Sequence, residues 1–181
     1  MSIFVKWAQT EHSLGRRVMA TLPAGVLFVG LFPYLILVAF PAMDQRLGVR
    51  LLETGAASYL LGGALVAVGL PFALWSIEAQ FTRGRGTPLP VMPTQGLLTT
   101  GPFCCCRNPM TFGTITAYLG LATAAATTVG LVVVIGLGAL LLLYLKRVEE
   151  KELAERFGEP YLAYKRSVPF IIPRRPKQGA P

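Results

Sequence analysis

Four long stretches without a single charged residue constrain this chain more than any other feature. They span residues 22–42, 55–77, 109–128 and 129–145. A helix needs about 20 apolar residues to cross a hydrocarbon layer about 30 Å thick, and each stretch reaches or approaches that length. Soluble helices carry a polar face, which these stretches lack. The sequence therefore predicts an all-α integral membrane protein with about four transmembrane helices.

The positive charge is concentrated at the termini and in the central loop. Of the 17 Lys and Arg residues, three precede residue 22, three lie between the second and third stretches, and nine follow residue 145. Only two lie between the first and second stretches. The positive-inside rule then predicts a multi-pass protein of the cytoplasmic membrane, with both termini cytoplasmic. Since this placement accounts for the net charge of +8, no nucleic-acid partner is expected.

A length of 181 residues predicts a single membrane domain. Residues 1–21 mix apolar and charged side chains, which suits an interfacial helix and a disordered tail equally well. The first two spans occupy 22–77, and between them residues 43–54 are expected to form a short outer loop whose charges cancel. A loop, a helical hairpin and a cytoplasmic helical tail occupy 78–173, and a short tail at 174–181 ends the chain.

A loop rich in glycine, proline and hydroxyl side chains separates the second and third stretches. Residues 93–113 read Pro-Thr-Gln-Gly-Leu-Leu-Thr-Thr-Gly-Pro-Phe-Cys-Cys-Cys-Arg-Asn-Pro-Met-Thr-Phe-Gly. Because proline is tolerated in a first helical turn, a helix is expected to start at Pro109. The fourth stretch continues without a break into Glu149 and Glu150, and Gly158 is expected to end that helix. Tyrosines follow at positions 161 and 164, and a Val-Pro pair at 168–169.

These segments, in this order, resemble the membrane methyltransferases that include isoprenylcysteine carboxyl methyltransferase and the phospholipid N-methyltransferases. In that family a Gly-Pro-Tyr-Arg-Tyr-Val-Arg-His/Asn-Pro-Met-Tyr-x-Gly segment precedes a helical hairpin. A Glu-Glu pair and a Phe-Gly-x-x-Tyr-x-x-Tyr…Val-Pro tail follow the hairpin. The resemblance covers residues 81–173.

The resemblance implies methyl transfer from S-adenosylmethionine (SAM) to a lipophilic acceptor, either an isoprenylcysteine-like carboxylate or a phospholipid-like amine. Such a transfer needs no metal, so the protein has to bind and orient the cofactor and exclude water. By position, catalytic roles fall on Arg107, Asn108 and Glu150, and substrate contacts on Tyr161 and Tyr164. The implied cofactor contacts are Gln95, Gly96, Leu97, Leu98, Phe103, Asn108, Pro109, Met110, Thr111 and Glu149.

Some of these residues have a second interpretation. Glu149 and Glu150 also fit the solvated start of a charged helix, and Tyr161 and Tyr164 fit plain packing as well as substrate contact. We expect the acceptor to enter from the inner leaflet, beside the second span or the hairpin. Apolar residues should line that entrance, among them Leu74, Phe81, Met110, Phe112 and Gly113.

The chain departs from the family pattern at three places. Asn108 stands where many members have histidine, Thr111 replaces a tyrosine, and three cysteines at 104–106 replace an Arg-Tyr-Val triplet. The one histidine, His12, is far from the loop in sequence, so no imidazole base is expected, which favours an acceptor that is already ionised. Consecutive cysteines make a poor metal site, so no metal is expected. Packing or S-acylation would suit them.

Two other functions fit the same features. The sterol reductases share a related C-terminal helical arrangement, so an NADPH-dependent membrane reductase is one alternative. A non-catalytic, lipid-binding membrane protein is the other. Binding of SAM, of its product S-adenosylhomocysteine (SAH) or of NADPH would separate the three.

Overall fold

The computed structural model describes residues 14–84 and 96–175, and within them every regular element is helical. The predicted interfacial segment therefore lies mostly outside the described residues, as does the end of the tail. The first helix is continuous from Leu14 to Leu47 and consists of α2 (Leu14–Gly25), η1 (Val26–Leu31), α3 (Phe32–Tyr34), η2 (Leu35–Ala39) and α4 (Phe40–Leu47). The remaining elements are α5 (Ala56–Thr82), η3 (Gly101–Cys104), α6 (Pro109–Ala124), α7 (Thr128–Tyr144), η4 (Leu145–Glu149), α8 (Glu150–Phe157) and α9 (Glu159–Ser167).

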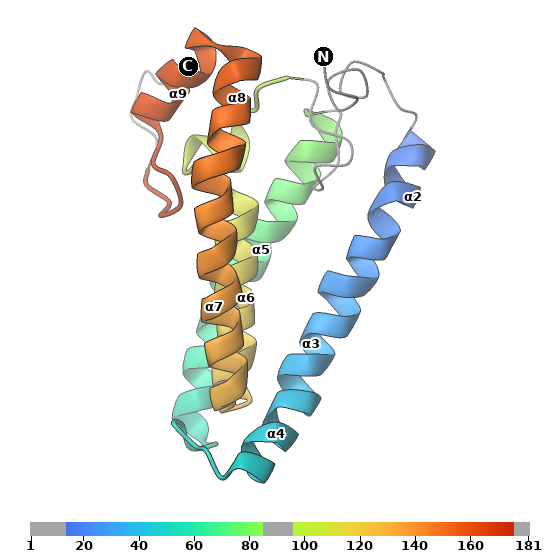
Figure 1. The fold of residues 1–181 in the computed structure, drawn as a ribbon, viewed down its shortest axis with the longest axis vertical. Helices are drawn as coiled ribbons and strands as arrows, with labels where there is room; N and C mark the ends of the chain where they lie inside the picture. The colour runs from blue at the N-terminus through green and yellow to red at the C-terminus, as the bar shows by residue number, and fades with distance from the viewer. Residues whose placement is uncertain (1–13, 85–95, 176–181) are drawn as a thin grey trace.

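The described helices form four rods, namely 14–47, 56–82, 109–124 and 128–157. They run alternately up and down along the long axis of the molecule (Figure 1). The start of α2 and the helices α8 and α9 lie at one end, which we call the tail end. The turns after α4 and after α6 lie at the opposite end, the hairpin end. The fourth rod extends from α7 through η4 into α8 and ends at Gly158, whose φ of 61° is one that glycine adopts without strain.

Three of the rods are long and apolar enough to cross a membrane, namely Met19–Leu47, Ala56–Thr82 and Thr128–Phe157. The all-α membrane fold is thus confirmed. The rod formed by α6 has 16 residues, which at 1.5 Å per residue is about 24 Å, less than the roughly 30 Å of a hydrocarbon core. The fourth span therefore stays a prediction.

A close backbone contact joins α5 to α6 through four glycines. A Cβ added to any of them would lie within 2.6 Å of a backbone atom of the other helix, so no side chain fits between them. Such small residues let membrane helices approach closely enough for dispersion and backbone contacts to hold them together. The four are Gly62 and Gly69 on α5, and Gly113 and Gly120 on α6.

Gly113 corrects one of our expectations. The sequence suggested it as a wall of an acceptor entrance, but it is buried against α5, where an added Cβ would lie 2.4 Å from the backbone nitrogen of Ala73. A larger side chain there would separate two helices rather than narrow an entrance. Its role in this structure is packing.

The first helix is attached to α6 through a carbonyl group that a proline leaves free. The N–H of Phe32 bonds to the oxygen of Leu27, five residues back. In that register Pro33, which has no N–H, leaves the oxygen of Phe28 unpaired. The hydroxyl of Tyr118 on α6 donates a hydrogen bond to that oxygen. A neighbouring helix thus satisfies a polar group that lipid could not.

At the hairpin end, Asp44 holds the start of α7. We expected residues 43–54 to form a loop with mutually cancelling charges, but Asp44 is buried within α4. Its two carboxylate oxygens accept hydrogen bonds from the backbone nitrogens of Thr128 (2.8 Å) and Val129 (2.9 Å). A carboxylate at a helix N-terminus satisfies free N–H groups and complements the helix dipole. This aspartate therefore has a structural role that links two helices.

Gly69→Leu should destabilise the protein by about 3 kcal/mol, since overpacking a tight interface forces the helices apart. Gly63→Leu is the matched control, because Gly63 is exposed on the same helix and an added Cβ meets nothing within 4 Å. Thermal unfolding in detergent would measure both. Equal midpoints for the two variants would contradict the packing role.

Candidate active site

A C-terminal strap, residues 168–175, runs alongside the loop that precedes α6. Three hydrogen bonds hold it there. The Arg107 N–H donates to the Pro169 oxygen (2.9 Å), the Asn108 Nδ2 donates to the Phe170 oxygen (3.0 Å), and the Arg174 N–H donates to the Cys105 oxygen (3.0 Å). Two parts of the chain that are about sixty residues apart thereby meet at the tail end. Asn108 uses its amide for this contact and makes no side-chain cap at the start of α6.

A buried carboxylate joins the same loop to α8 and α9. Glu150 lies 2.6 Å from Nη1 of Arg107 and 2.8 Å from Nζ of Lys165. The side chains of Glu150 and Arg107 are 6% and 11% exposed, whereas that of Lys165 is 41% exposed. A buried charge is tolerated only when it is paired, so Glu150 depends on Arg107 far more than on the solvated lysine.

The guanidinium of Arg107 has bonding capacity left over. Its Nη1 approaches Glu150 off the line of its N–H bonds, so this contact is an ion pair without an aligned hydrogen bond. Its Nε is buried and has no acceptor among the described residues. Buried donors are nearly always satisfied, so this Nε is a candidate donor for an anionic group.

The two tyrosines of α9 lie next to the ion-paired residues Arg107, Glu150 and Lys165. Tyr161 and Tyr164 are 2% and 5% exposed and pack with Val168, as do the half-buried Leu97 and Phe157. The hydroxyl of Tyr164 donates to the Phe103 oxygen at 2.7 Å. Plain packing therefore accounts for both rings, and substrate contact stays a prediction.

Burial favours the protonated forms of one tyrosine and two thiols in this region. It raises the pKa of Tyr161, and the Glu150 carboxylate raises it further although the Arg107 guanidinium acts against this. Burial also raises the pKa of the Cys106 thiol to about 11. The pKa of Cys105 is raised by burial and then by Cys104. The neutral forms prevail near pH 7, so these thiols are poor nucleophiles there.

The residues expected to hold the cofactor occupy different environments. Pro109 and Thr111 are buried at the start of α6, whereas Gly96 is exposed. The sulfur of Met110 lies 3.7 Å from the side-chain nitrogen of Gln80 on α5. Gln95 lies outside the described residues. The half-buried members are Leu97, Leu98, Phe103, Asn108, Met110 and Glu149.

Two contributors to this region were missed from the sequence. Lys165 completes the ion-pair cluster, and the Phe170 ring lies 5.6 Å from the Arg107 guanidinium carbon and 5.7 Å from the Lys146 nitrogen. These distances fit cation–π contacts. The family pattern gives neither position a role, and only the folded tail brings them to the loop.

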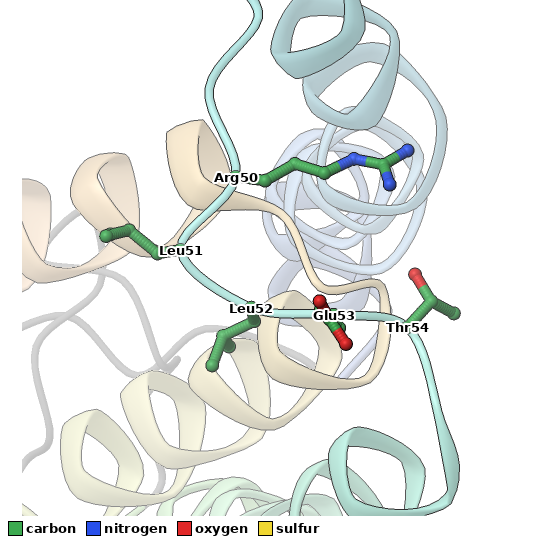
Figure 2. A pocket seen from close by; sticks show the side chains of 5 residues that line it. All are labelled: Arg50, Leu51, Leu52, Glu53 and Thr54. Atoms are coloured by element: carbon green, nitrogen blue, oxygen red, sulfur yellow. The ribbon is translucent and has the colours of Figure 1, made fainter.

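The hairpin end has a surface pocket that is separate from the residues described above. Residues 50–54 line it, with Leu51 and Leu52 pointing away from Arg50 (Figure 2). It lies in the turn between α4 and α5, at the end opposite to α8 and α9 (Figure 1). No residue that we expected to act in methyl transfer borders it.

The structure thus defines a helical membrane protein whose cluster of buried polar groups lies at the tail end of its apolar rods. A comparison with protein families matches residues 57–160 to the phospholipid methyltransferase (PEMT) family, so more than half of the chain is covered and it belongs to that family. The resemblance stated from the sequence is confirmed. The family consists of membrane methyltransferases that act on lipid-like substrates. Neither the curated proteins nor the solved structures include a significant match.

Glu150→Gln should destabilise the protein by about 3 kcal/mol, because it leaves Arg107 buried without its counter-charge. Lys165→Met removes the solvated partner and should cost less than about 1 kcal/mol. Thermal unfolding of both variants in detergent would compare them. A loss for Lys165→Met as large as that for Glu150→Gln would argue against this ranking.

Proposed function

We propose that this protein transfers the methyl group of SAM to a lipophilic acceptor in the membrane. The observation that carries the proposal is the family match over residues 57–160, which contains the loop, α6, α7 and α8. The contacts of that loop with α9 and the strap add support, because they gather polar groups at one place beside the apolar rods.

The residues present fit the chemistry of SAM. Its methionine carboxylate needs a cationic donor, and the buried Nε of Arg107 has no other acceptor among the described residues. Its ammonium and ribose hydroxyls need acceptors, for which the half-buried Glu149 is our candidate. Its adenine ring needs apolar and aromatic surroundings, which Leu98 and Phe103 would provide. When bound, SAM supplies an electrophilic methyl group.

The chain's own residues would then perform three tasks. Arg107 would bind and orient an anionic group, and Glu150 would fix the position of Arg107 through their ion pair. Asn108 would hold the strap over the loop, which helps to exclude water from the reacting atoms. Arg107, Asn108 and Glu150 are therefore the residues that we propose for catalysis, with Glu150 acting through Arg107.

The acceptor is proposed to arrive from the bilayer rather than from water. Leu74 on α5 is 55% exposed on the apolar surface of the rods, and Phe112 on α6 is half-buried against Phe72, with ring centroids 5.4 Å apart. A lipophilic molecule stays solvated by lipid on such a route. An isoprenylcysteine-like carboxylate and a phospholipid-like amine are both compatible with it, and we favour the carboxylate because it is ionised without a base.

The proposal is tested by titrating the purified protein with SAH, SAM and NADPH in a calorimeter. SAH and SAM should bind, and NADPH should not. Methyl-labelled SAM incubated with the protein and a lipid extract should then give a labelled lipid product. Binding of NADPH alone would favour a reductase, and binding of none of the three would favour a non-catalytic protein.

Glu149→Gln should weaken SAH binding by about 2 kcal/mol, or roughly thirtyfold, the scale of a lost hydrogen bond to a charged group. Glu152→Gln is the matched control, because Glu152 is exposed on the same helical rod. Thermal midpoints would verify that both variants are folded. If the two variants bound SAH equally well, Glu149 would belong to the solvated start of α8 instead.

A further inference from the structure

The C-terminal strap is held in place at both of its ends. Pro169 and Phe170 accept hydrogen bonds from Arg107 and Asn108, and the N–H of Arg174 donates to Cys105. The residues between these points cannot move far without breaking a bond. Whatever they expose is therefore presented at a fixed position.

That position lies at the boundary of the apolar layer. The last apolar run of the chain ends at Leu145, and Lys146 is the first charged residue after it. The Lys146 nitrogen lies 5.7 Å from the Phe170 ring, so the strap passes at the depth of Lys146. Tyr144, two residues before Lys146, is 46% exposed and is a residue type that favours the membrane interface.

The strap exposes an apolar side chain flanked by cations. Ile172 is 69% exposed, and both Arg174 and Arg175 are exposed next to it. Lys146 and Arg147 are exposed on the neighbouring rod. Residues 168–175 contain no acidic side chain, so nothing within the strap neutralises its arginines.

We propose that the strap docks onto anionic phospholipids of the surrounding leaflet, with Ile172 inserted between the headgroups and Arg174 and Arg175 on their phosphates. An apolar side chain gains free energy by leaving water, and cations next to it gain from the negative surface potential of an anionic leaflet. Segments that combine the two are typical of interfacial anchors.

Docking would bear directly on the candidate active site. The strap takes its hydrogen bonds from Arg107 and Asn108, so a strap fixed by lipid keeps the loop in place. A bilayer without anionic lipid would leave the loop less ordered. The inference concerns lipid contact alone, and its test needs no methyl transfer, so it can fail while the proposed function holds.

The test uses Ile172→Trp in the full chain, reconstituted in nanodiscs that contain shallow brominated acyl chains as quenchers. One set contains phosphatidylcholine alone, and the other contains about one third phosphatidylglycerol. After subtraction of the emission of the unsubstituted protein, the new tryptophan should be quenched, and more strongly with phosphatidylglycerol. Adding Arg174→Gln and Arg175→Gln should lower the ratio of docked to undocked strap about fivefold per arginine.

Leu162→Trp provides the matched control, since Leu162 is exposed on α9 outside the strap, and its emission should be unquenched. Thermal midpoints equal to that of the unsubstituted protein would show that each variant is folded. No additional quenching at position 172 would overturn the proposal. Equal quenching in the two lipid compositions, or no effect of the arginine substitutions, would overturn it as well.

Discussion

The backbone contact between α5 and α6 is the constraint on which the rest of the structure depends. In a bilayer, burying apolar side chains between helices gains little over burying them in lipid, so close approach has to provide the attraction. The glycines of these two helices allow such an approach. Because α5 and α6 are antiparallel and joined by the loop that contains η3, their contact fixes both ends of that loop. The other face of α6 packs against the first helix and α7 around Ile36, Ala122 and Val134.

The two ends of the bundle use a buried carboxylate in different ways. At the hairpin end, Asp44 is satisfied by backbone N–H groups at the start of α7, so it needs no cation. At the tail end, Glu150 is ion-paired with two cationic side chains. The backbone N–H groups that bind Asp44 do no more than join α4 to α7. The Arg107 side chain that pairs with Glu150 has a further N–H donor, at Nε, that is available to a ligand. For this reason we propose the tail end as the place of the chemistry.

The sequence predicted what depends on composition and on local chain signals. Uncharged runs indicated the apolar rods, Gly158 indicated the end of the long fourth rod, and the family pattern selected the loop and tail that the structure brings together. What it missed depends on contacts between distant segments. Asp44 appeared to be a loop charge because its partners lie more than eighty residues away. Gly113 was expected to line an entrance, because the sequence around a glycine does not show which helix packs against it.

The Tyr118 hydroxyl donates its hydrogen bond to a main-chain oxygen, that of Phe28. This oxygen is free to accept it because Pro33 lacks an N–H. The bond itself does not use the Phe28 side chain, although the Phe28 ring stacks on Phe32 and the Phe32 ring stacks on Tyr118. The attachment of the first helix through this bond therefore requires Pro33 and Tyr118 together. The family match begins at residue 57, after this helix. The two residues are accordingly expected to co-vary in relatives that carry such a helix, and a tyrosine at this position would mark its presence.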